Sequence, residues 1–135
     1  MILDLAVNAK RKPVPLSDIS KRQNISLKYL EHLTRKLREA GLIKSQRGAY
    51  GGHMLKKAPA DITVGDIVRT LEKTTAITDC AETEDKLCGV CNQAGDCLSR
   101  WVWIEASRAM FARLDEITVE RLVSGSFIPK EGSRV

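Results

Sequence analysis

The stretch from Ser17 to Lys57 restricts the possible folds more than any other part of the chain. Two amphipathic segments are separated by only three residues, Gln23 to Ile25, and Gly41 follows the second segment. Ser17 and Ser26 can each cap a helix, and glycine favours the left-handed conformation that ends one. Two short apolar stretches then flank a glycine-rich turn, as in a β-hairpin. The pattern predicts a helix–turn–helix followed by a hairpin, with helices at 18–22 and 27–40 and strands at 42–46 and 53–56.

The second predicted helix of this pair has two different faces. Its apolar residues fall within one arc of a helical wheel: Leu27, Leu30, Leu33, Leu37 and Ala40. The opposite side is polar and mostly basic, with Tyr29 at its edge: Lys28, Glu31, His32, Arg35, Lys36, Arg38 and Glu39. A helix in this position enters the major groove of DNA, where Lys28 and Arg35 can reach guanine or phosphate and Glu31 can accept from cytosine. Any surface helix has a similar wheel, so the wheel alone leaves both interpretations open.

Positive charge is concentrated in the first part of the chain. Residues 1–60 contain 13 Lys and Arg against 4 Asp and Glu, whereas residues 61–135 contain 9 against 13. The net charges are +9 and −4, which sum to the +5 of the whole chain. A basic segment beside an acidic one favours a polyanion-binding head on a body with another role. In the predicted hairpin, Arg47 adjoins the glycine-rich turn and suits a narrow minor groove, although a turn without a partner has the same composition.

Four cysteines lie within 18 positions, in the order Cys80-x7-Cys88-x2-Cys91-x5-Cys97. The loop around them is poor in large apolar residues, so we do not expect these thiols in a core. With no export signal and no apolar run long enough to span a membrane, we expect a cytoplasmic protein with reduced thiols. The spacing favours an iron–sulfur cluster, because four-cysteine zinc sites usually pair two CxxC units and only one is present. Zinc and redox-active thiols are the alternatives.

Further helices are predicted around this loop, at 2–9, 64–72, 98–114 and 119–123. Thr63 and Asp66 have the spacing of a capping box at the start of the second of these. The long helix has two apolar stripes, one with Trp101, Ile104 and Phe111, the other with Val102, Ala106 and Ala109, and Trp103, Met110 and Leu114 between them. One stripe suffices to pack a helix onto its own chain, so the second predicts a homodimer. A monomer whose head covers both stripes is the alternative.

Taken together, these segments resemble the Rrf2 family of bacterial winged-helix regulators, of the IscR, NsrR and CymR type. The matching stretches are VPLSDISKRQNISLKYLEHLTRKLREAGLIKSQRGAYGG, APADITVGDIVRTLE and the cysteine loop with CLSRWVW. The resemblance implies a DNA-binding winged helix, a homodimer formed by the long helix, and an iron–sulfur cluster on three loop cysteines and a fourth ligand. It also implies that Arg47 enters the minor groove and that the recognition helix meets DNA at Ser26, Lys28, Tyr29, Glu31 and His32.

The chain departs from the family pattern in two places. Members with a two-iron cluster often have histidine three residues after the last loop cysteine, where this chain has Arg100, which offers no lone pair to a metal. Cys91 is then either the fourth ligand or an additional thiol beside Cys80, Cys88 and Cys97. Family members also begin further upstream of the first helix, so we expect a misassigned or truncated start.

The sequence therefore predicts a mainly α-helical protein with a small β-hairpin wing. We expect a homodimeric transcriptional regulator that binds double-stranded operator DNA, and a thiol- or zinc-based regulator or a protein-interaction module is the alternative. An enzyme is not expected, because the only histidines, His32 and His53, lie far from the cysteines in sequence. The expected organisation is a DNA-binding head, a connecting helix with a sensor loop, a dimerisation region and a flexible tail: residues 1–60, 61–97, 98–124 and 125–135.

Overall fold

The computed structural model describes residues 1–9, 12–72, 74–82, 91 and 96–126. The chain is mainly helical, with one antiparallel two-stranded hairpin. The elements, in order, are α1 (Ile2–Asn8), α2 (Leu16–Gln23), α3 (Leu27–Glu39), β1 (Ile43–Gln46), β2 (Gly52–Leu55), the 3-10 turn η1 (Pro59–Asp61), α4 (Val64–Leu71), the 3-10 turn η2 (Asp79–Ala81), α5 (Leu98–Asp115) and α6 (Val119–Val123). These elements confirm the predicted fold class, a winged helix–turn–helix followed by a long helix.

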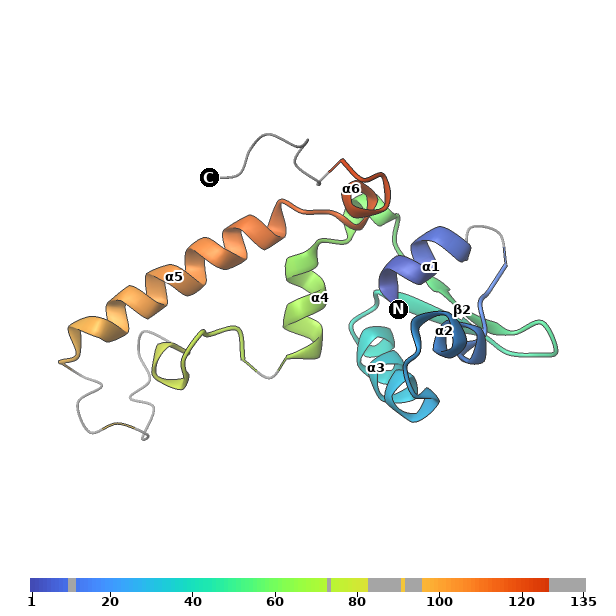
Figure 1. Ribbon diagram of the computed structural model, residues 1–135, viewed down its shortest axis with the longest axis horizontal. Coiled ribbons are helices and arrows are strands. Elements are labelled where there is room, and N and C mark those ends of the chain that lie inside the picture. Colours follow the sequence, from blue (N-terminus) through green and yellow to red (C-terminus); the bar gives the residue numbers. More distant parts are fainter. Residues whose placement is uncertain (10–11, 73, 83–90, 92–95, 127–135) are drawn as a thin grey trace.

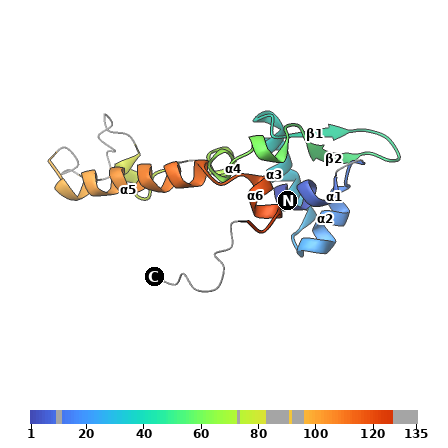
Figure 2. The same cartoon turned by 90° about the horizontal axis from the view of Figure 1, so that it is seen from above.

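The molecule consists of a head and an arm. The head contains α1, α2, α3, the hairpin and α6, and α5 extends from it as the arm, with α4 between them (Figure 1). The hairpin, called the wing below, and the N-terminal end of α5 lie at opposite ends of the molecule (Figure 2). Backbone bonds from Val64 N–H to the carbonyl of Ile117 (2.8 Å) and from Val119 N–H to that of Ile62 (2.9 Å) join the start of α4 to the junction between α5 and α6. None of the helices in the described ranges is long and apolar enough to cross a membrane.

The core of the head is built from aliphatic side chains. The largest fully buried ones come from α1, α2, α3, β1, the residue before the α4 cap and the start of α6: Leu5, Ile19, Leu30, Leu37, Ile43, Ile62 and Val119. Their removal from water is the main favourable contribution to folding. The core therefore agrees with the low aromatic content, 4% of the chain.

The ends of α2 and α3 explain the sharp turn between them. Asn24 adopts the left-handed conformation (φ 52°) after α2, and the Ser26 hydroxyl accepts a bond from the Tyr29 amide at the start of α3. Gly41 (φ +72°) ends α3, and the Leu42 amide bonds back to the Leu37 carbonyl at 2.9 Å. This pattern closes a helix where glycine is favoured, as the sequence predicted.

One predicted cap is wrong. Ser17 was expected to cap the second helix, but α2 begins at Leu16 and Pro15 occupies the capping position without a side-chain bond. Proline suits the start of a helix because its fixed φ matches the first turn and it has no N–H to satisfy. The capping box of Thr63 and Asp66 at the start of α4, in contrast, is confirmed.

A buried carboxylate joins the first two helices. The Asp4 side chain on α1 is 1% exposed and accepts bonds from Arg22 Nη2 (2.7 Å), Arg22 Nε (3.0 Å) and Gln23 Nε2 (3.1 Å) at the end of α2. A buried charge is costly unless it is paired and hydrogen-bonded, as here. The Arg22 guanidinium holds the pKa of Asp4 below its ordinary value of 3.8.

We predict that replacing Asp4 with Asn lowers the free energy of unfolding by about 2 kcal/mol near neutral pH, because charge-assisted bonds are lost at a buried position. Urea denaturation measures the difference. Asp115→Asn is the matched control, since Asp115 also accepts two bonds from an arginine but is 42% exposed. We expect the control to lose less than about 1 kcal/mol.

The pair of Asp4 and Arg22 also predicts how the free energy of unfolding depends on pH. Because the pKa of Asp4 is lower in the folded chain, its stabilising contribution is complete above the ordinary value of 3.8 and is lost as the pH falls through the folded value. The stability difference between the wild type and Asp4→Asn should therefore shrink on acidification. A difference that stays constant between about pH 7 and about pH 3 would contradict this assignment.

Candidate nucleic-acid interface and cysteine loop

The outer face of α3 is open to solvent. Every residue predicted to contact DNA on this helix and at its cap is exposed: Ser26, Lys28, Tyr29, Glu31, His32 and Arg35. A shallow hollow of about 360 Å³ lies over Ser26, Lys28, Tyr29 and His32. Since α3 is fixed at its N-terminus by the Ser26 cap, these side chains project from a rigid helix rather than from a loop.

The inner face of α3 differs from the wheel in two ways. First, Thr34 is buried together with Leu30 and Leu37, and its hydroxyl donates to the Leu30 carbonyl at 2.7 Å. Second, Leu27 and Ala40, expected on the packed side, are exposed because they stand at the two ends of the helix, where the neighbouring elements no longer cover it.

The wing is a basic hairpin. Its two strands pair in a register that runs from Ile43 opposite Leu55 to Gln46 opposite Gly52. The backbone of Val14 donates to the His53 carbonyl and accepts from the His53 amide, each at 2.9 Å. Arg47 lies exposed at the start of the turn. From Ala40 to Ala60 the sequence has four Lys or Arg and no Asp or Glu. Burial and the nearby Arg38 lower the pKa of His53, which leaves the histidine neutral and bonded to the Ser45 hydroxyl at 2.9 Å.

Helix α4 contacts α3 on one side and the arm on the other. Lys36, predicted on the polar face of α3, is half-buried and donates to the Leu71 carbonyl at the end of α4 (2.7 Å). Arg69 of α4 makes two bonds to Asp115 of α5 (2.7 and 2.6 Å) and lies over the Phe111 ring, 4.8 Å from its centroid. Residues so distant in sequence carry no local signal of these contacts.

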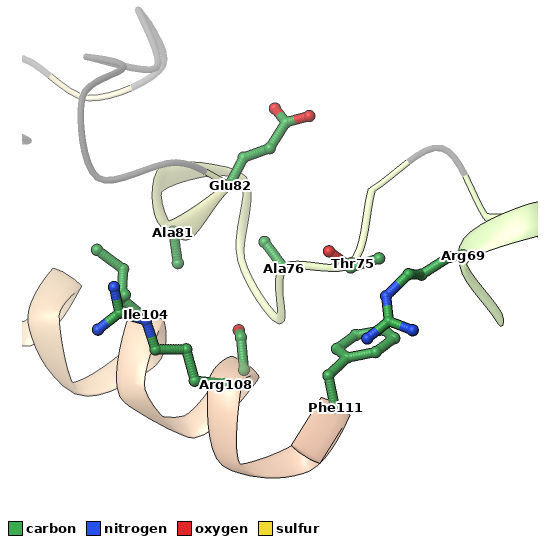
Figure 3. Close-up of a pocket in the computed structure, with 9 residues that line it drawn as sticks. Arg69, Thr75, Ala76, Ala81, Glu82, Ile104, Arg108 and Phe111 are labelled. Carbon is green, nitrogen blue, oxygen red and sulfur yellow. The ribbon is translucent and has the colours of Figure 1, made fainter. Parts of the chain in front are cut away.

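The arm approaches α4 closely at one glycine. A Cβ atom at Gly65 would lie 1.8 Å from Asp115 Oδ1, so the ion pair fits only because Gly65 has no side chain. A pocket of about 300 Å³ opens beyond this contact, between α4, residues 75–82 and α5 (Figure 3). Ile104 and Phe111 form its apolar side, and Arg69, Glu82 and Arg108 stand around it.

The cysteine loop is described in part. Cys80 is half-buried, with its sulfur 3.3 Å from the Thr78 hydroxyl, Cys97 is half-buried at the N-cap of α5, and Cys91 is exposed. Cys88 lies outside the described residues. In the ranges that are described, the cysteines form no disulfide and no three metal-binding side chains converge. The proposed ligand set of Cys80, Cys88, Cys91 and Cys97 stays a prediction.

Arg100 has a role that the sequence did not indicate. The residue is 4% exposed, and its Nε donates to the Cys80 carbonyl at 2.6 Å. Its guanidinium also lies 5.9 Å from the centroid of the Trp101 ring. Arg100 therefore holds the first loop cysteine against the first turn of α5.

One side of the arm is covered and another is open. Ile104 and Phe111 are buried, whereas apolar side chains on the rest of the helix are largely exposed within this chain: Leu98 (83%), Trp101 (48%), Val102 (64%), Trp103 (42%) and Met110 (40%). The head does not cover them, because α5 extends away from it (Figure 1). Several exposed apolar side chains on one helix are typical of an interaction surface.

Comparison with known proteins agrees with this architecture. A family model described as "Rrf2: Iron-dependent Transcriptional regulator" matches residues 1–125. The chain is 41% identical to Protein rrf2 of Nitratidesulfovibrio vulgaris over 136 aligned residues, which cover 100% of this chain and 88% of the relative.

Solved structures give the same result. T. potens IscR superposes with a TM-score of 0.71 at 34% identity, covering 99% of this chain and 83% of IscR. CymR, the global cysteine regulator of B. subtilis, superposes with a TM-score of 0.71 at 38% identity, covering 92% of this chain and 88% of CymR. These relatives are regulators and not enzymes. With its winged helix–turn–helix and this match over nearly its whole length, the chain belongs to the Rrf2 family of transcriptional regulators.

Proposed function

We propose that this regulator reads operator DNA with the exposed face of α3 and with Arg47, as a homodimer whose cysteine loop holds an iron–sulfur cluster. The observation that carries the proposal is the outer face of α3, where every predicted contact residue is exposed on a capped helix beside a basic wing. Phosphate contacts give affinity and base contacts give sequence preference, and this face offers groups for both.

The residues on that face have different kinds of chemical role in the proposal. Lys28 and Arg35 donate to phosphate or to guanine, and Glu31 accepts from cytosine and disfavours other bases. Ser26, Tyr29 and His32 add hydrogen-bonding groups around the hollow at the start of α3. Arg47 enters a narrow minor groove, where the negative potential is strongest.

The open side of α5 supports a homodimer. Association of two arms through Val102 and the neighbouring apolar side chains would remove from water a surface that one chain leaves exposed. Two heads related by a two-fold axis match two half-sites about one helical turn apart.

The cysteine loop supports the sensing part of the proposal. Thiolates of Cys80, Cys88 and Cys97, with Cys91 as a further ligand or a spare thiol, are suitable donors for iron, whereas the buried Arg100 is not. An iron–sulfur cluster bound there supplies a centre that responds to oxidation, nitric oxide or iron supply. The matching family is described as iron-dependent, which favours this choice. A thiol-based regulator is the second candidate, favoured by the likeness to the cysteine regulator CymR.

The contacts of α4 provide a route from the loop to DNA. The loop joins α4 to α5, the Arg69–Asp115 pair ties α4 to the arm, and Lys36 ties α3 to α4. A change in the order of the loop therefore acts on helices that position the two reading faces. The loop acts as a switch only if the protein binds DNA with different affinity in its two loop states.

We predict that Arg35→Ala weakens binding to operator DNA about tenfold and reduces the slope of log affinity against log salt by about one. Fluorescence anisotropy with a duplex selected from a random pool by the wild-type protein measures both quantities. Arg121→Ala, which removes an exposed arginine from α6, is the control and should leave both unchanged. Equal losses in the two variants would contradict the assignment of α3 as the reading helix.

For the arm, we predict that Val102→Asp converts the dimer into a monomer, because the partner's apolar side chains would have to bury a charge. Sedimentation velocity reports the mass. Tyr50→Asp at the wing tip is the control: it also replaces an exposed apolar side chain with a charged one, and it should remain dimeric. A wild-type protein that sediments as a monomer would remove this part of the proposal.

For the loop, we predict that protein isolated without oxygen contains iron and acid-labile sulfide and absorbs in the visible range. Cys80→Ala should lose both elements while keeping its helical circular dichroism. Zinc without sulfide, or thiols without metal, would replace the cluster with one of the thiol-based alternatives.

A further inference from the structure

Tyr50 is the most exposed of the large apolar side chains in the described ranges. It is 91% accessible at the tip of the wing, although the chain has only six aromatic residues. An aromatic side chain contributes to folding only when it is removed from water, so Tyr50 adds almost nothing to the stability of this chain. Its position points to a contact made outside the chain.

The turn that carries Tyr50 is tight rather than loose. The Gly51 amide bonds to the Gly48 carbonyl at 2.9 Å, which closes a turn with Ala49 and Tyr50 at its centre. A Cβ atom at Gly51 would lie 2.4 Å from the Gln46 carbonyl oxygen, and Gly48 has a φ of +113°. Glycine is thus needed on both sides of the turn that holds Tyr50, and this turn joins β1 and β2 at the far end of the wing (Figure 2).

The surroundings of Tyr50 identify the partner as a polyanion. Arg47 begins the same turn, and the wing segment has further cations at Lys44, Lys56 and Lys57 with no acidic residue from Ala40 to Ala60. A contact with an apolar protein surface would have to bury these charges, whereas DNA neutralises them. The walls of the minor groove are deoxyribose rings, which offer an apolar surface beside the phosphates.

We propose that Tyr50 is a further DNA-contacting residue, which packs its ring against the deoxyribose wall of the minor groove that Arg47 enters. This inference rests on the proposed DNA binding and adds a contact that is not ionic. Because a closed turn holds the backbone that carries the ring, docking orders only the side chain of Tyr50 and not the loop. Tyr50 supplies affinity through apolar burial, while Arg47 supplies it through charge.

The experiment compares Tyr50→Ala, Tyr50→Phe and Arg47→Ala on a duplex selected by the wild-type protein, using fluorescence anisotropy at several salt concentrations. We expect Tyr50→Ala to bind about tenfold more weakly, as burial of roughly half an aromatic side chain implies, with an unchanged salt slope. Tyr50→Phe keeps the ring and should bind within about twofold of wild type. Arg47→Ala should reduce the slope by about one.

Hydroxyl-radical footprinting locates the contact, because these radicals cleave accessible deoxyribose. Tyr50→Ala should lose protection of the sugars at the edge of each half-site and keep protection elsewhere. Wild-type affinity in Tyr50→Ala, or an unchanged sugar footprint, overturns the inference and leaves DNA binding intact. Failure of the wild-type protein to select any duplex overturns the proposed function instead. Since Tyr50 is almost fully exposed, its substitution leaves the fold unaffected, which circular dichroism checks.

Discussion

Burial of Leu30 and Leu37 is the contact on which the rest of the structure depends. Both side chains of α3 are almost completely removed from water in the core of the head. Because a helix cannot turn about its axis without exposing such residues, their burial fixes which side of α3 faces solvent. The row from Lys28 to Arg35 is oriented by packing on the opposite side, so the face that we propose to contact DNA is a consequence of the core.

Elements defined by local chemistry could be predicted from the sequence. The Thr63 and Asp66 capping box, the Ser26 cap and the left-handed Gly41 each act within a few residues, and all three lie where the pattern placed them. The face of α3 was also predictable, because helical periodicity alone determines which residues share a side. Its ends were not, since coverage of Leu27 depends on where the neighbouring elements stop.

Contacts between distant residues could not be predicted. Lys36 reads as one more cation on the polar face, yet it bonds to the end of α4, 35 residues further along the chain. In the sequence, Arg100 is notable only because it stands where some family members have a histidine ligand, yet in the structure it is buried and bonded to the Cys80 backbone. Both side chains are long and amphipathic, so their composition suits solvent and interior equally well. Only the arrangement of the helices decides between these environments.

The close approach at Gly65 affects how α4 and the arm meet. A side chain there would push the Asp115 carboxylate away from Arg69 and so weaken one contact between α4 and the arm. A small change in the angle between α4 and α5 at this point would move the far end of α5 by a larger distance, because α5 is 18 residues long. In the dimer that we propose, the absence of a side chain at Gly65 would therefore help to set the angle between the two subunits, and with it the length of double helix that the pair can span.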